Sequence, residues 1–281
     1  MGILMLDEVT WGDVDKLDRD KTMVFLPLSP IEEHGPHLPL GTDYYAARDV
    51  AEMAVRLISE KESAIDCLLF PPIPLGSTEM TMDFPGTISV RGETLARIVK
   101  DICSSFARHG FKYIVICNHH LDPVHVKALL EGVNRVVQEY DVKIIETAGR
   151  IIYSGMKTKQ GIHLRNMGLK VAQEIHADAT ETSFIKYRYP RLLKDTYKEL
   201  PSVWVDIRAC TRKGMTTFKA MGADQGYIGS PAQATEELGR MHLEELAELT
   251  AELALKLYRN EALPEISKEM MAVIDSSIKL D

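Results

Sequence analysis

Short apolar runs and longer amphipathic stretches alternate along the chain. Apolar runs bounded by Pro, Gly or polar residues predict buried strands at residues 22–28, 66–71, 113–117 and 142–147. Apolar residues at helical spacing predict helices at residues 44–62, 91–109, 123–140, 163–176 and 231–258. This alternation predicts an α/β fold in which helices cover both faces of a mostly parallel central sheet. Residues 184–228 show only mixed short runs, and we expect them to shape substrate choice.

Length and composition fit one large domain over residues 1–281 that is 45% hydrophobic and 26% charged. The net charge of -8 and the lack of a dense Lys/Arg cluster argue against a nucleic-acid partner. No apolar run approaches membrane-spanning length, and the N-terminus has no secretory pattern, so we expect no membrane association. The four cysteines are scattered without a CxxC pair, which favours a reducing compartment, and we expect a cytoplasmic protein.

Two polar clusters follow predicted strands. Glu32, His34 and Asp43 surround a Gly-Pro loop after residues 22–28, and His120 and Asp122 follow the strand at 113–117. In parallel sheets ligands bind at the carboxyl ends of strands, where both clusters fall. Carboxylates and imidazoles suit Zn, Mn or Fe better than a thiolate-preferring ion. The five groups could hold two metals with the Asp43 carboxylate between them.

Other titratable side chains are interpreted differently. His176 is expected to end the helix at 163–176, with Glu181 five residues on, and beside a metal site His176 becomes a candidate proton shuttle. His119 stays open, because it could exchange roles with His120. A structural or solvated role is favoured for five further residues: Glu33, His37, His109, His125 and His242.

Several motifs follow one another in a fixed order: Glu32-x-His34-Gly-Pro-His-Leu-Pro-Leu-x-Thr-Asp43, Phe84-Pro-Gly-Thr87, Asn118-x-His120-x-Asp122 and His176-Ala-x-x-x-Glu181-Thr-Ser183. With a weaker pattern at Gly229-Ser-Pro231 and Ala234-Thr-Glu236, this order resembles the creatininase family of metal-dependent amidohydrolases. The resemblance runs from about residue 8 to the last predicted helix.

The resemblance implies a three-layer α/β/α sandwich, a dinuclear metal centre and a homo-oligomer, commonly a hexamer. The two metals would share Asp43, with Glu32 and His120 on the first metal and His34 and Asp122 on the second. The implied cofactors are two divalent ions per chain, Zn and/or Mn, with Fe as a further candidate.

The implied reaction is hydrolysis of a C–N bond in a small cyclic amide or a formamide. A metal-bound hydroxide would attack the carbonyl carbon while the metals hold the developing oxyanion. His176 would act as acid/base toward the leaving nitrogen, and Glu181 would support the site.

Departures from the family pattern bear on the substrate. His119 and Leu121 stand in a segment where members often read Asn-Gly-His followed by small residues, and Asp122 stands where creatininases proper carry Glu. Creatininases proper close tryptophans over creatinine, whereas the two tryptophans here, Trp11 and Trp204, lie outside the metal motifs. A formamide, such as the formamidopyrimidine of archaeal flavin synthesis, or another small amide is therefore favoured over creatinine.

Three alternatives stay open. The chain could be a peptidase-like member that acts on a modified peptide, or a non-catalytic ligand-binding homologue, although the intact ligand set argues against the latter. A phosphoesterase is the third alternative, against which stands the absence of a Gly-rich phosphate loop.

Overall fold

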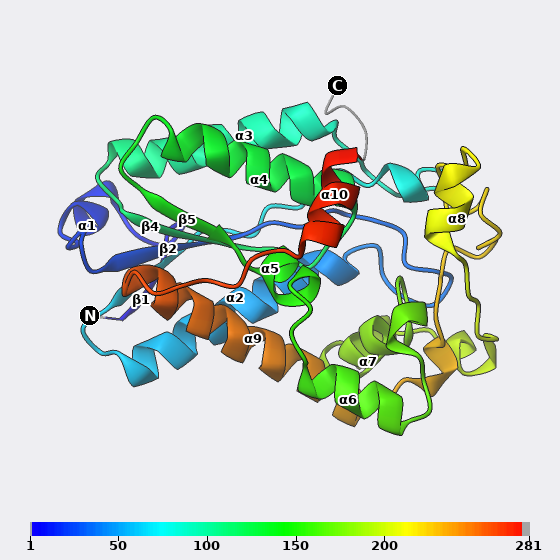
Figure 1. Ribbon diagram of the computed structural model, residues 1–281. Helices are drawn as coiled ribbons and strands as arrows, with labels where there is room; N and C mark the ends of the chain where they lie inside the picture. Colours follow the sequence, from blue (N-terminus) through cyan, green and yellow to red (C-terminus); the bar gives the residue numbers. More distant parts are fainter. Residues whose placement is uncertain (1, 277–281) are drawn as a thin grey trace.

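The computed structural model describes residues 2–276 (Figure 1). The single domain predicted over 1–281 includes residue 1 and residues 277–281, which lie outside this range, so its full extent stays a prediction. None of the helices within the described range has the length and apolar content needed to cross a membrane.

A parallel sheet forms the middle layer. Its five strands run in the order β1-β3-β2-β4-β5, and every neighbouring pair is parallel. The strand bounds are β1 Ile3–Met5, β2 Thr22–Pro27, β3 Asp66–Leu69, β4 Tyr113–Cys117 and β5 Lys143–Glu146. The four predicted strands are therefore confirmed as β2 to β5, and the short edge strand β1 was not predicted.

Helices cover both faces of the sheet, as Figure 1 shows, with α3 and α4 above it and α2 and α9 below it. The helix bounds are α1 Trp11–Asp15, α2 Thr42–Lys61, α3 Gly92–Arg108, α4 Pro123–Val137, α5 Thr147–Tyr153, α6 Lys159–Asn166, α7 Ala179–Arg188, α8 Ile207–Arg212, α9 Glu236–Tyr258 and α10 Lys268–Ser276. Short 3-10 turns occupy η1 Glu79–Thr81, η2 Val171–Gln173, η3 Pro190–Leu192, η4 Asp195–Glu199 and η5 Pro231–Gln233. The predicted three-layer α/β/α sandwich is confirmed.

Side chains alternate along the buried strands and supply two apolar cores. On β2, Met23 and Phe25 point into the core toward α2 and α9, whereas Val24 and Leu26 point into the core toward α3 and α4. All four are fully buried, which is why a continuous apolar run suits a strand covered on both faces.

Two helix predictions need correction. The helix predicted at 163–176 is α6, which begins at Lys159 and ends before Gly168, whose φ of +81° stops it. Residues beyond it form η2 and an extended segment. The helix predicted at 231–258 begins only at Glu236, because Thr235 is its N-cap and the Thr235 hydroxyl accepts the N–H of Leu238.

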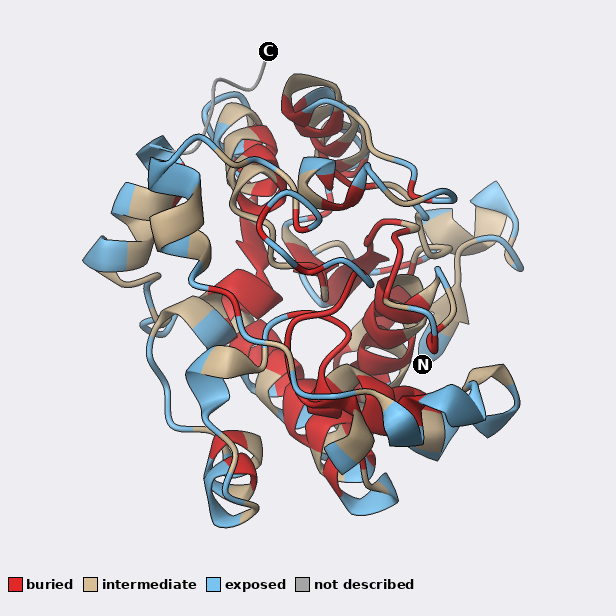
Figure 2. Ribbon diagram, turned by 90° about the vertical axis from the view of Figure 1, so that its right-hand side faces the viewer, coloured by how far each residue is buried: buried red, intermediate tan, exposed pale blue. Residues whose placement is uncertain are grey.

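The topology places a switch point at the centre of the sheet. From β2 the chain passes through α2 on one face to β3, and from β4 it passes through α4 on the other face to β5. Because β2 and β4 are neighbours, the loops at their carboxyl ends diverge to opposite faces and leave room for a ligand between them. Figure 2 looks onto the right-hand end of the view in Figure 1, and loops at its centre are buried.

Candidate metal centre

The loop between β2 and α2 brings three candidate ligand side chains to the end of the sheet. Glu32 and His34 lie in this loop, and Asp43 is in the first turn of α2. Gly35 turns the chain directly after His34 with a φ of +66°, in the left-handed region that favours glycine. The loop closes on itself, because the N–H of Glu32 donates to the carbonyl of Leu40 at 2.9 Å. This closed loop therefore brings Asp43 close to Glu32 and His34.

Asn118 fixes His120 at the end of β4. Its side-chain amide donates to the carbonyl of His120 at 2.6 Å, and its Oδ1 accepts the N–H of His120 at 2.9 Å and the hydroxyl of Ser29 at 3.0 Å. The Nε2 of His120 donates to the carbonyl of Ser77 at 3.1 Å, so Nδ1 faces the carboxylates. A metal-binding histidine is usually held in this way by its second nitrogen.

Two groups of ligand atoms share Asp43. Glu32, Asp43 and His120 form one group, and His34, Asp43 and Glu181 form the other, with the ligand atoms of each group within 4.8 Å of one another. The two carboxylate oxygens divide between the groups, since Oδ2 lies 3.1 Å from Nδ1 of His120 and Oδ1 lies 3.5 Å from Nε2 of His34. A carboxylate shared in this way could bridge the two ions of a dinuclear site.

Two ligand atoms in this cluster make no hydrogen bond although they are buried. Oε1 of Glu32 accepts the hydroxyls of Thr78 and Thr81, whereas Oε2 has no hydrogen-bond partner even with Nδ1 of His120 at 2.9 Å. Nδ1 of His34 donates to the carbonyl of Glu32 at 3.0 Å, and its Nε2, 3.5 Å from Oδ1 of Asp43, makes no hydrogen bond. Buried polar atoms are rarely left unpaired, so these two atoms fit a cation that they would bind.

The charge state of the two carboxylates, Glu32 and Asp43, suits cation binding. Burial raises the pKa of Glu32, but His120 and His176 outweigh it and hold that pKa at about 2. Burial likewise opposes ionisation of Asp43, yet His34 and hydrogen bonds from His119 and His120 lower its pKa well below the ordinary value. Both carboxylates are therefore charged at neutral pH, which is the form that binds metals.

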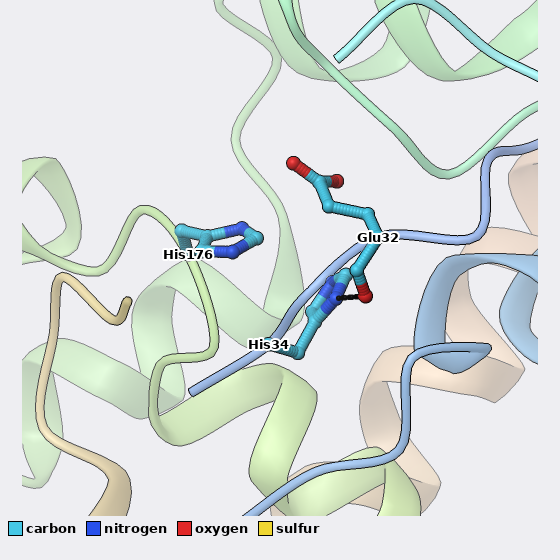
Figure 3. A group of neighbouring side chains, drawn as sticks. All are labelled: Glu32, His34 and His176. Carbon is cyan, nitrogen blue, oxygen red and sulfur yellow. Dashed lines mark hydrogen bonds between the residues drawn. The ribbon is translucent and has the colours of Figure 1, made fainter. Parts of the chain in front are cut away.

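His176 reaches the cluster from an extended segment and not from the end of a helix, which corrects the sequence interpretation. It pairs with Ile228 in an isolated bridge, and Nε2 donates to the carbonyl of Glu33 at 2.9 Å. Its ring centroid lies 4.5 Å from that of His34, and a ligand atom of His176 groups with Glu32 and His34 (Figure 3). Burial and His34 lower the pKa of His176, but Glu32 and Glu33 outweigh them and raise it.

Glu181 and Asp122 differ from their predicted places. Glu181, expected to support the site, belongs to the group with His34 and Asp43, and its Oε2 accepts the N–H of Ala177 at 2.6 Å. Asp122, expected on the second metal, is in neither group. It is the N-cap of α4, where Oδ1 accepts the N–H of Val124 at 2.7 Å. Its role as a ligand stays a prediction, and the geometry favours Glu181 in that place.

Several supporting contacts were missing from the sequence interpretation. The hydroxyls of Thr78 and Thr81 hold Glu32, and Thr87 of the Phe-Pro-Gly-Thr turn accepts the N–H of Glu33 at 3.0 Å. His119 contacts Asp43 through Nδ1 at 2.8 Å. The position of Thr87 in a matched motif was a usable signal, whereas the two threonines of the irregular segment 77–81 gave none.

Comparison with known proteins finds relatives that each match part of this chain. The chain is 26% identical over 142 residues to the creatinine amidohydrolase of Pseudomonas putida, which covers 48% of this chain and 51% of the relative. It is 30% identical over 97 residues to the mycofactocin precursor peptide peptidase of Mycolicibacterium smegmatis, covering 34% and 39%. It is 22% identical over 172 residues to the 3-dehydro-scyllo-inosose hydrolase of Thermotoga maritima, covering 61% and 51%. The matches span at most about half the length of these relatives.

Solved structures extend the likeness over nearly the whole fold. A manganese form of creatininase superposes with a TM-score of 0.71 at 22% identity, covering 90% of this chain and 97% of that chain. A Zn-Zn form of a creatininase mutant gives a TM-score of 0.70 at 22% identity, covering 90% and 96%. At this identity the likeness shows the fold alone.

The family assignment depends on the sequence as a whole. A sequence model of the creatininase family, described as creatinine amidohydrolase, matches residues 7–254. This range contains every motif that carried the resemblance, together with both ligand groups around Asp43. The chain therefore belongs to the creatininase family.

Proposed function

We propose that the protein is a metal-dependent hydrolase of a C–N bond in a small cyclic amide or a formamide. The observation that carries the proposal is the buried carboxylate of Asp43 shared by two ligand groups, with Oε2 of Glu32 and Nε2 of His34, which make no hydrogen bond, beside it. Carboxylate and imidazole ligands suit Zn and Mn, with Fe as a further candidate. Two divalent ions held there would polarise a carbonyl oxygen and lower the pKa of a shared water molecule.

The chain's own residues supply orientation and proton transfer. Threonine hydroxyls hold Oε1 of Glu32, and a backbone carbonyl holds Nδ1 of His34. The other ligand atom of each side chain, Oε2 and Nε2, is thereby oriented toward the proposed metal site. His176 donates Nε2–H to the carbonyl of Glu33, so Nδ1 is left to take a proton from the attacking water and pass it to the leaving nitrogen. In this proposal Glu181 binds the second metal and is not only a support.

The tryptophans bear on the substrate. Trp11 is 84% exposed and Trp204 is 57% exposed, and neither is part of the buried ligand cluster. Val205, the neighbour of Trp204, is buried in an apolar cluster with Phe218, whose ring centroid lies 5.2 Å from that of His176. We therefore favour a small formamide or amide over creatinine.

A peptidase-like activity is the second candidate. It is favoured by the matches to mycofactocin precursor peptide peptidases, which reach 33% identity over 117 residues in the Mycobacterium ulcerans protein. A non-catalytic ligand-binding role is disfavoured, because both ligand groups and His176 are in place.

A homo-oligomer, with a hexamer as first candidate, belongs to the same proposal and is tested by light scattering.

A turnover panel tests the proposal. Zn- and Mn-loaded protein is incubated with creatinine, a formamidopyrimidine, short peptides and 3-dehydro-scyllo-inosose, and products are identified by mass spectrometry. The matched variants are Asp43→Asn, which keeps the side-chain shape, and Asp224→Asn at an exposed carboxylate. We expect formamide turnover that Asp43→Asn abolishes and Asp224→Asn retains. Turnover of peptides alone would favour the peptidase-like activity instead. Full metal content and full turnover in Asp43→Asn would refute the metal centre.

A further inference from the structure

His119 lies between the carboxylate of Asp43, which both ligand groups share, and the buried side chain of His242. Its Nδ1 is 2.8 Å from Oδ1 of Asp43, and its Nε2 is 2.9 Å from Nε2 of His242 on α9. Nδ1 of His242 is in turn 2.8 Å from Oε1 of Gln160 on α6. The three side chains form one hydrogen-bonded line that ends on the carboxylate common to both ligand groups.

The direction of the last hydrogen bond follows from chemistry. An ionised carboxylate only accepts, so Nδ1 of His119 carries the proton and donates to Asp43. The accepting atom is Oδ1, the oxygen that faces His34, whereas Oδ2 faces His120. The contact therefore acts on the half of Asp43 that belongs to the group with His34 and Glu181.

The line is anchored behind His119. His242 is buried, and the backbone N–H groups of Lys159 and Gln160 donate to the carboxylate of Glu245, one turn further along α9, at 2.6 and 2.8 Å. Gln160 also donates to the hydroxyl of Thr180 at 3.1 Å. The ties between α6 and α9 hold His242 in place, so the ring of His119 cannot turn without breaking its hydrogen bonds to Asp43 and His242.

We propose that His119, supported by His242, is a positioning residue that holds Oδ1 of Asp43 toward His34 and Glu181 and so strengthens binding of the second metal. The inference rests on the proposed metal centre. Partners of ligating carboxylates orient them, and loss of such a partner typically weakens metal binding by about 10- to 100-fold. The first metal, which uses Oδ2 of Asp43 with Glu32 and His120, should respond less.

Matched substitutions separate positioning from other roles. His119→Asn places an amide where Nδ1 stands and keeps a donor to Asp43. His119→Gln places an amide where Nε2 stands and keeps only the contact to His242, and His119→Ala keeps neither. Zn²⁺ affinities come from competition with a chromogenic chelator, stoichiometries from elemental analysis, and thermal unfolding of the metal-free proteins reports on folding.

The expected result is two Zn²⁺ per wild-type chain and a second-site affinity about 10- to 100-fold weaker in His119→Ala and His119→Gln. His119→Asn should restore that affinity to within a few-fold of wild type. His242→Asn, which removes the contact to His119, should weaken the second site more than His242→Gln, which retains an amide at that point.

Three outcomes would overturn parts of the argument in different ways. Wild-type affinity in His119→Ala would show that Asp43 needs no such support. Loss of the metal in His119→Asn as complete as in His119→Ala, with normal thermal unfolding, would make His119 a direct ligand and not a positioning residue. Fewer than two Zn²⁺ per wild-type chain would refute the proposed metal centre itself.

Discussion

Glu146 is a buried carboxyl group at the end of β5 and the N-cap of α5. Both of its oxygens accept the N–H of Gly149, at 3.1 and 3.0 Å. Burial nevertheless dominates and raises the pKa of Glu146 from the ordinary 4.5 to about 7. Replacing Glu146 with Gln keeps the shape and an acceptor for Gly149 but removes the charge, which makes Glu146→Gln a direct probe of this burial.

The sign of the effect follows from proton binding. Between pH 4.5 and about 7 the unfolded chain has lost the proton of Glu146 while the folded protein retains it. The stability contribution is therefore fully present below pH 4.5 and is lost as pH rises through about 7. One pKa unit corresponds to about 1.4 kcal/mol, so a shift from 4.5 to about 7 amounts to roughly 3 kcal/mol.

Urea unfolding of the metal-free proteins at a series of pH values measures this term. The free energy of unfolding of Glu146→Gln minus that of wild type should grow by roughly 3 kcal/mol between pH 4.5 and pH 8. The same substitution at the exposed Glu60 is the control and should run parallel to wild type. Parallel profiles for Glu146→Gln and wild type would refute the reasoning, because they would mean that Glu146 ionises as readily in the folded protein as in the unfolded chain.

Two further predictions concern the metal ligands and the stability of the fold. Asp122→Asn should keep both metals and the cap of α4, because Asn caps helices as well as Asp, whereas Glu181→Gln should lose the second metal. Elemental analysis after dialysis checks both, and the reverse pattern would return Asp122 to the second metal. Gly226→Ala should lower the free energy of unfolding by roughly 1–3 kcal/mol, since Gly226 has a φ of +74° and an added Cβ would lie 2.1 Å from Oε2 of Glu33. Urea unfolding measures this, and wild-type stability would show that the Glu33 side chain moves aside without cost.

Much of the fold could be predicted because its signals are local. The apolar run at β4 predicts a buried strand by itself, since each side chain of residues 114–117 is buried on one face of the sheet or the other. The amphipathic pattern of α3 and the Pro at the start of α4 likewise act within one element. Apart from the short edge strand β1, which was not predicted, the corrections fall after β5, where short helices depend on tertiary packing and carry little periodicity, as at α6 and η2.

For the site, the sequence by itself determined the candidate ligands that lie close together along the chain. Glu32, His34 and Asp43 share one loop, and His120 follows a strand whose position was evident, so their convergence follows from spacing and from the rule for parallel sheets.

Only the tertiary structure decided which distant side chains complete the centre. The hydrogen bond between His119 and Asp43 spans 76 positions, that between His119 and His242 spans 123, and that between His176 and Glu33 spans 143. A bond of this kind depends on how α7 and α9 pack against the sheet, and packing depends on the whole core. A pattern over neighbouring residues does not predict that packing. The positions of Glu181 and His119 relative to Asp43 could therefore be known only from the folded chain.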